Sequence, residues 1–237
     1  MASLPGRSGM GSSSAFTVAL LGSLQKFRGG GILPLELAHQ AILLERIELG
    51  ESGGWQDQFH SAVGGFRLYQ FAKNKVDYSE QVGTFAFRTL LSSSLVLVAT
   101  GGGRDSTIHA TRTKDNILSG SQLTSINQLS DLTRDIAAEI NRTHDPVEAL
   151  KILSLGINEG WYLKKKISGH NELEVDELLN FGLSHGALGA KLCGAGGSGF
   201  AAFIVLPEMM EKFITNFDSK SIVRVELNEL GYESWVI

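Results

Sequence analysis

The sequence predicts an α+β fold in two lobes. Short segments with the apolar pattern typical of strands lie in both halves of the chain, and long helical patterns fill most of residues 106–190. The pattern resets around residues 80–90, which places a domain boundary near residue 84. We therefore expect lobes at residues 1–84 and 85–237, each with its own buried core.

The elements expected in the first lobe begin with a loop rich in glycine and serine, followed by a buried helix over residues 15–24. Residues 28–31, Arg-Gly-Gly-Gly, end that helix. A second helix is expected over residues 35–49, with Glu45 next to its apolar stripe and Glu48 on the stripe. A further segment opens at Trp55 and closes at Gly64 and Gly65, and alternation then predicts a strand over residues 66–71.

The elements expected in the second lobe begin with an apolar strand over residues 95–99, which ends at a glycine-rich turn. Three long helical patterns follow, and a strand, a short helix and a last strand complete the lobe. The expected ranges are helices at 123–141, 146–166, 175–185 and 208–217 and strands at 201–206 and 223–227.

Composition limits the classes of function. Of the 237 residues, 43% are hydrophobic and 19% charged, which is typical of a soluble globular protein, and the net charge of −4 argues against a nucleic-acid partner. No signal peptide or apolar run of about 18 residues is present, so we expect no membrane span and a cytoplasmic location. Cys193 is the single cysteine, which excludes an intramolecular disulfide and suits a reducing compartment.

The loop before the first helix has the chemistry of a phosphate cradle. Glycines let backbone N–H groups approach an anion, serine hydroxyls add donors, and the helix directs its positive dipole end at the same place. The predicted phosphate-binding residues are Gly9, Met10, Gly11, Ser12, Ser13 and Ser14.

A second glycine-rich stretch, residues 194–199, formally matches G-x-G-x-x-G. A dinucleotide fingerprint follows a strand and opens a helix, whereas here a helical pattern precedes the glycines and a strand follows them. A P-loop is also excluded, since no Gly-Lys-Ser/Thr triplet occurs.

Three segments together resemble the GHMP kinases, the superfamily of galactokinase, homoserine kinase and mevalonate kinase. They are residues 4–15 (LPGRSGMGSSSA), 54–58 (GWQDQ) and 191–200 (KLCGAGGSGF). The resemblance implies an N-terminal lobe like ribosomal protein S5 domain 2 and a ferredoxin-like C-terminal lobe. Within the superfamily the likeness is strongest to D-glycero-D-manno-heptose 7-phosphate kinases, through segments 56–58, 100–104, 161–165 and 186–191.

The resemblance also implies roles for individual residues. ATP and Mg²⁺ would be the cofactors, with Ser13 and Glu45 as metal ligands and Asp57 accepting or orienting the proton of the attacking sugar hydroxyl. Two alternatives stay open: Glu45 could be a solvated helix residue, and Asp57 could be a helix N-cap.

The substrate pocket is expected at the second glycine-rich stretch, although a purely structural turn competes with this interpretation. The candidate pocket residues are Gly194, Ala195, Gly196 and Gly197, together with Arg104 as a contact for a substrate anion. The lysine run 164–166 could meet a sugar phosphate but is also typical of a solvated helix face. None of the scattered histidines has metal-ligand spacing.

Relative to the family, the chain is expected to lack an N-terminal segment that carries the first strands, so its first lobe would be incomplete. Such a lobe exposes apolar surface, and we expect a homo-oligomer or a complementing N-terminal segment besides the small-molecule sugar. The expected function is an ATP-dependent sugar kinase acting on the anomeric hydroxyl of D-glycero-D-manno-heptose 7-phosphate. Alternatives are an L-fucose-kinase-like enzyme, because Trp55 matches that class, a galactokinase-like enzyme, and an inactive nucleotide-binding or interaction protein.

Overall fold

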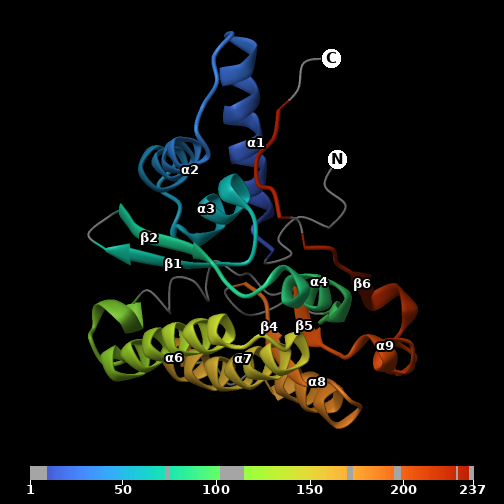
Figure 1. Cartoon of the computed structure of the whole chain (residues 1–237). Helices are drawn as coiled ribbons and strands as arrows, with labels where there is room; N and C mark the ends of the chain where they lie inside the picture. The colour runs from blue at the N-terminus through green and yellow to red at the C-terminus, as the bar shows by residue number, and fades with distance from the viewer. Residues whose placement is uncertain are drawn as a thin grey trace. The chain divides into compact units, whose positions relative to one another are not determined.

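The computed structural model describes residues 10–72, 75–101, 115–169, 173–194, 199–227 and 229–234 (Figure 1). The chain forms two compact units, the first made of Met1–Gln81 with Asn228–Ile237 and the second of Val82–Leu227. The expected lobes divide at residue 84 and place the whole C-terminus in the second lobe. The structure differs there, because the backbone N–H of Tyr232 donates to the carbonyl of Ala62 at 3.0 Å.

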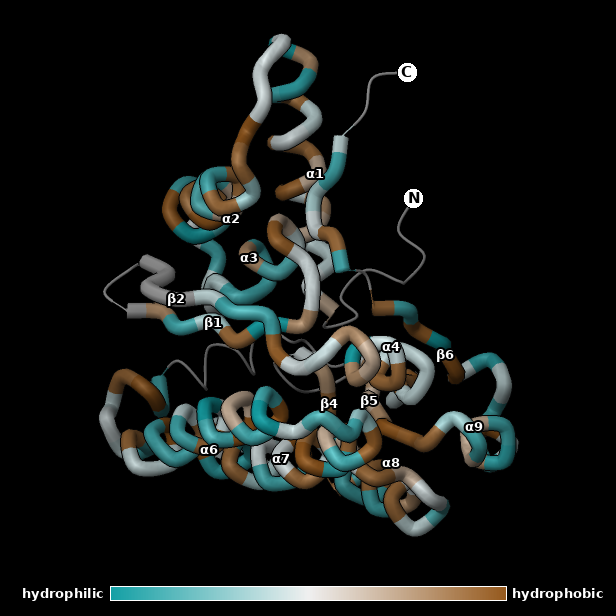
Figure 2. The backbone as a smooth tube through the Cα atoms, in the orientation of Figure 1, coloured by the Kyte–Doolittle hydropathy of each residue, from teal (hydrophilic) through white to brown (hydrophobic). Residues whose placement is uncertain are grey.

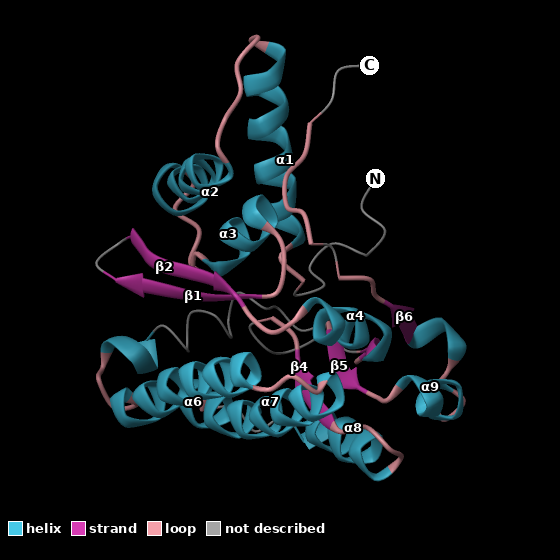
Figure 3. Ribbon diagram, viewed as in Figure 1, coloured by secondary structure: helices cyan, strands magenta, loops and turns pink. Residues whose placement is uncertain are grey.

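The first unit combines helices with one hairpin (Figure 3). Its elements are α1 (Ser12–Phe27), α2 (Pro34–Ile42), the π-helical turn η1 (Leu43–Glu48), α3 (Gln56–Val63), β1 (Arg67–Ala72) and β2 (Lys75–Gln81). The two strands are antiparallel, with Arg67 opposite Gln81 and a register irregularity between Gln70 and Phe71. The predicted helix over residues 35–49 is thus present as two consecutive helical segments with different hydrogen bonding.

The core of the first unit forms where α1, α2 and α3 meet. Its buried hydrophobic residues are Val18, Leu37, Ala38, Ala41, Ile42, Phe59 and Ala62. Leu37 and Ala41 continue along the same face to Glu45, which is 1% exposed, while Glu48 faces solvent. The expected placement of Glu48 on the apolar stripe, with Glu45 beside it, is therefore wrong: Glu45 itself is the buried residue.

Helix α1 is buried on one face only, although its apolar content predicts a buried helix. Ser14, Thr17, Val18 and Gly22 are buried. Four apolar side chains lie on the opposite side and face solvent. Figure 2 shows apolar stretches of the tube along α1. They are Phe16, Leu20, Leu24 and Phe27, exposed by 68%, 43%, 46% and 89%. We call these four residues the α1 apolar face.

The second unit is built on a four-stranded antiparallel sheet with the order β4-β5-β3-β6. The elements are α4 (Phe85–Ser94), β3 (Leu95–Ala99), α6 (Leu123–Arg142), α7 (Pro146–Ser168), α8 (Leu173–Ser184), β4 (Gly189–Leu192), β5 (Phe200–Ile204), α9 (Pro207–Ile214), the 3₁₀ turn η2 (Ser219–Ser221) and β6 (Ile222–Arg224). Helices connect β3 to β4 and β5 to β6, which is the connectivity of a ferredoxin-like lobe and confirms the predicted fold class.

Side chains from this sheet pack against α8 and α9 to form the core of the second unit. The core includes Val96, Val98, Leu179, Leu192, Phe203 and Phe213. Gly189 lets the sheet edge approach α7, since a Cβ at this position would lie 2.9 Å from the Cα of Ser154. Among the helices that the structure describes, none has both the length and the apolar content needed to cross a membrane.

Candidate phosphate-binding and catalytic site

The phosphate loop meets the start of α1 at Gly11, which adopts a left-handed conformation with φ of +68°. No side chain caps this helix end, and its first turn contains no acidic residue. The first backbone N–H groups of a helix lack partners within the helix, so this end can donate to an anion. Of the predicted cradle, residues 10–14 have this placement, and Gly9 lies outside the described residues.

Asp57 lies in the first turn of α3, with its side chain against Gly11. A Cβ built on Gly11 would be 3.2 Å from the Cγ of Asp57 and 3.4 Å from its Oδ1. The N-cap position of α3 belongs to Trp55, so the structure does not support the alternative that Asp57 caps this helix. The candidate base is therefore next to the phosphate loop.

The environment of Asp57 acts on its pKa in two directions. Burial raises the pKa of this carboxyl above its ordinary value because desolvation disfavours the charged form, and the charge of Glu45 acts in the same direction. The positive charges of Arg46 and His60 oppose this rise. The balance is a raised pKa, which favours proton acceptance by a carboxylate once it is ionised.

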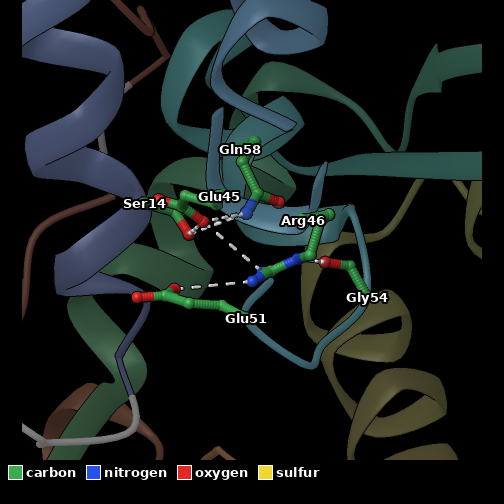
Figure 4. A network of polar contacts seen from close by, with 6 residues as sticks. All are labelled: Ser14, Glu45, Arg46, Glu51, Gly54 and Gln58. Atoms are coloured by element: carbon green, nitrogen blue, oxygen red, sulfur yellow. Dashed lines mark hydrogen bonds and ion pairs between the residues drawn. The ribbon is translucent and has the colours of Figure 1, made fainter. Parts of the chain in front are cut away.

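Glu45 is held in a buried network with two polar side chains from α1 and α3 (Figure 4). The Ser14 hydroxyl donates to Glu45 Oε2 at 2.9 Å. The side-chain amide of Gln58 donates to the same carboxylate oxygen and, at 3.0 Å, to the Ser14 hydroxyl oxygen. Gln58 is 0% exposed, so the network joins three helical segments in the interior of the first unit. The alternative of a solvated Glu45 is therefore wrong.

Arg46 links this network to the glycine-rich segment before α3. Its Nη2 lies 3.5 Å from Glu45 Oε2, and its Nε donates to the Gly54 carbonyl at 3.1 Å. Glu51 completes the contacts, with its Oε2 at 3.7 Å from Arg46 Nη1. A Cβ on Gly53 would be 2.9 Å from the guanidinium, so the glycine allows the loop to lie on Arg46.

The predicted metal ligands are Ser13 and Glu45, and the structure places Ser14 in contact with Glu45, while Ser13 is exposed. Glu45 Oε1 is buried and accepts no hydrogen bond from the described residues. A carboxylate oxygen and a hydroxyl are ligands that Mg²⁺ accepts, and Mg²⁺ usually binds one or two carboxylates plus phosphates and waters. These residues fit such an ion, and the described ranges hold no cluster of three His, Cys, Asp or Glu side chains that would form an all-protein site.

The second glycine-rich stretch is described at its two ends. Gly194 follows β4 and has a φ of +73°. At the other end, the backbone N–H of Thr100 donates to the carbonyl of Gly199 at 3.0 Å, and the backbone N–H of Gly199 donates to the Thr100 hydroxyl at 3.1 Å. Lys164 donates to the Gly194 carbonyl, which the sequence did not indicate. Predicted pocket residues Ala195, Gly196 and Gly197, and the anion contact Arg104, lie outside the described residues.

The three lysines of the run 164–166 do not form one basic patch, because each contacts a different group. Lys165 makes an ion pair with Asp176 at 2.8 Å, and the Lys166 ammonium lies 4.4 Å from the ring centre of Tyr162. Cys193 is half-buried, and burial raises the pKa of its thiol. A raised pKa disfavours the reactive thiolate.

Sequence reasoning missed Gln58, Arg46 and Ser14 as partners of Glu45. Their positions carried a signal, since Gln58 belongs to the same short motif as Asp57, and Arg46 follows Glu45 directly. What the sequence could not give was the direction of each side chain, because a shift of one residue along a helix turns a side chain by about 100°.

Two domain models of one family match the chain. Residues 2–65 match the model of the GHMP kinases N terminal domain, and residues 136–232 match that of the GHMP kinases C terminal domain. A bifunctional fucokinase/GDP-fucose pyrophosphorylase from Arabidopsis thaliana is 28% identical over 89% of this chain and 20% of its own length. A D-glycero-alpha-D-manno-heptose 7-phosphate kinase from Campylobacter jejuni is 26% identical over 99% of this chain and 69% of its own length.

A solved structure shares the fold. It is a D-glycero-D-manno-heptose 1-phosphate kinase from Bacteriodes thetaiotaomicron, with a TM-score of 0.67 and 22% identity over 98% of this chain. The chain spans 66% of that protein and one fifth of the Arabidopsis enzyme. The two domain models together cover more than half of the sequence, in the order that the family requires. The chain belongs to the GHMP kinase family.

Proposed function

We propose that this chain is an ATP-dependent sugar kinase that transfers the γ-phosphate to a sugar hydroxyl. The observation that carries the proposal is the contact of the Asp57 side chain with Gly11. A carboxylate beside a phosphate-binding helix end can orient the attacking hydroxyl close to the phosphate that it attacks.

Each part of the site has a task in this proposal. The amide groups at the start of α1 bind the β- and γ-phosphates of ATP, and Asp57 accepts or orients the proton of the attacking hydroxyl. Glu45 and a serine hydroxyl of the loop would hold Mg²⁺. When bound, Mg²⁺ neutralises charge on the transferred phosphoryl group.

The proposed acceptor is the anomeric hydroxyl of D-glycero-D-manno-heptose 7-phosphate. The likeness to the Campylobacter heptose phosphate kinase over nearly the whole chain supports this choice. L-fucose is the main competing acceptor, because the sequence identity of the Arabidopsis fucokinase to this chain, 28%, is close to the 26% of the heptose phosphate kinase. Trp55, which precedes the aspartate motif, also favours L-fucose. Galactose is the third acceptor to be tested.

The test is a coupled assay of ADP release with each of the three sugars, run in the presence and absence of Mg²⁺. We expect turnover with the heptose phosphate that depends on Mg²⁺ and is lost in Asp57→Asn. Turnover with L-fucose or galactose alone would correct the acceptor and keep the reaction. ATP binding without turnover on any sugar would reject the kinase assignment in favour of a nucleotide-binding protein.

A further inference from the structure

The two carboxylate oxygens of Glu45 have unequal surroundings. Oε2 accepts from the Ser14 hydroxyl and the Gln58 amide and lies 3.5 Å from the Arg46 guanidinium. Oε1 is equally buried and has no donor within the described part of the chain. A buried carboxylate oxygen without a donor is costly, so this arrangement favours a positively charged partner at Oε1.

Gln58 is the residue that fixes this asymmetry. Its side chain lies between Ser14 in α1 and Glu45 in η1, and Figure 4 shows the three side chains directed at one another. The amide orientation follows from chemistry: an amide rotated by 180° would direct its oxygen at the carboxylate, where two acceptors repel. Gln58, which is fully buried, thus holds Oε2 through its amide donor.

The same turn of α3 carries Asp57. Its side chain contacts Gly11 of the phosphate loop, while the next residue, Gln58, contacts the carboxylate of Glu45. One helical turn therefore sets the position of the candidate base and of the candidate metal ligand together. Such coupling would keep the Asp57 and Glu45 carboxylates at fixed positions relative to one bound nucleotide.

We propose that Gln58 is a positioning residue that holds Glu45 through Oε2 and leaves Oε1 to bind the divalent cation of a metal–nucleotide complex. The inference rests on the proposed kinase function and adds a role for a residue that does not itself touch ATP or sugar. It predicts that Gln58 governs metal affinity more than nucleotide affinity.

The test uses the full chain and three variants. Gln58→Met removes the amide at nearly constant volume, and Gln58→Asn keeps the amide but shortens its reach. Gln40→Met is the matched control, since Gln40 lies on α2 of the same unit and its amide oxygen accepts from Gln25 at 3.5 Å, outside the Glu45 network. Mn²⁺ binding in the presence of ADP is measured by water-proton relaxation, and ADP binding without metal by calorimetry.

We expect Gln58→Met to weaken Mn²⁺ binding by about 10-fold to 100-fold, the range usual for residues that orient metal ligands. Gln58→Asn should show a smaller loss, and Gln40→Met should bind Mn²⁺ like the wild type. ADP binding without metal should stay unchanged in all three variants. Raised Mg²⁺ should restore the turnover of Gln58→Met, because its defect is in affinity.

Two results would overturn the proposal. One is wild-type Mn²⁺ affinity in folded Gln58→Met or, where that variant does not fold, in Gln58→Asn. The other is an equal loss of ADP binding with and without metal, which indicates a merely structural role. Failure of the proposed function is distinguishable, because the wild type would then show no turnover with any of the three sugars. Failure of the present inference alone leaves wild-type turnover intact and appears only in the Mn²⁺ affinity of the Gln58 variants.

Discussion

Asp57 and Gly11 are in contact across the first unit, although 46 positions separate them in the sequence. The contact exists because Gly11 has no side chain and holds a left-handed φ of +68° at the start of α1. Any Cβ there would press on the carboxylate group of Asp57. The glycine therefore serves both the backbone turn and the position of the candidate base.

Substitution of Gly11 by alanine separates these two effects when it is compared with Gly29→Ala. Gly29 also has a left-handed φ, of +78°, but a Cβ there would meet no atom within 4 Å. Both variants should lose about 1–2 kcal/mol of stability from backbone strain. Only Gly11→Ala should also lower kcat, by about 10-fold to 100-fold, because it displaces Asp57. Denaturant titration and the ADP-release assay measure the two quantities, and an equal kcat in both variants would contradict the contact.

Asp57→Asn should reduce kcat by about 100-fold to 10,000-fold while nucleotide binding stays close to that of the wild type, because the change removes the proton acceptor alone. Steady-state kinetics and calorimetry with ADP measure the two effects. Turnover equal to that of the wild type would reject Asp57 as the base.

The same variant makes a prediction about stability. The pKa of Asp57 is raised in the folded protein, so the ionised carboxylate destabilises the fold at pH values above the raised pKa. Asp57→Asn should therefore melt at a higher temperature than the wild type near neutral pH. The gain should shrink as the pH falls and vanish below about pH 4, where the carboxyl is protonated in both the folded and the unfolded chain. A gain that does not depend on pH would show that desolvation of the charge is not its cause.

Arg46→Met should move the acid limb of the kcat/KM profile toward higher pH. Of the two positive charges that lower the pKa of Asp57, Arg46 has the larger effect. Its removal therefore lets desolvation raise that pKa further. Arg46→Lys keeps a charge near the carboxyl and should leave the limb nearer its original position. The full pH profile of both variants provides the measurement, and identical limbs would mean that Asp57 does not control this part of the profile.

The α1 apolar face predicts association with another polypeptide, either a second copy of the chain or an added N-terminal segment. A contiguous exposed apolar stripe favours such contacts. The double variant Phe16→Ser, Phe27→Ser should lower the average mass in sedimentation velocity and change stability by no more than about 0.5 kcal/mol. Phe85→Ser is the control, since Phe85 is 71% exposed on α4, and it should leave the mass unchanged. An unchanged mass in the double variant would argue against this face as an interface between two copies of the chain.

Much of the fold was predictable because its long elements have strong periodic patterns. Helices α6 and α7 and the apolar strand β3 lie where periodicity placed them. Strand β4 was missed because its four residues, Gly-Ala-Lys-Leu, have no alternation and pair only through tertiary contact with β5. Helix α4 was also missed, although Thr84 caps it by accepting from the Phe87 N–H at 3.2 Å.

The candidate site was predictable as motifs but not as contacts. The glycine and serine loop, Glu45 and Asp57 stand out by residue type and by likeness to a family. Burial of Glu45 was not evident, since a charged residue on a helix is usually solvated unless it is paired. Its pairing depends on Gln58, which approaches from a different helix, and such a tertiary contact has no local signature in the sequence.

The close fit between the C-terminal segment and the helices of the first unit affects how this protein is made. A Cβ built on Gly22 would lie only 2.3 Å from Cζ of the Tyr232 ring. A Cβ built on Gly64 would lie 2.3 Å from the backbone nitrogen of Gly231. During synthesis these contacts form only after the entire second unit has been translated. The helices that carry the phosphate loop and Asp57 thus complete their packing only after the second unit has been synthesised, although they are themselves synthesised before it.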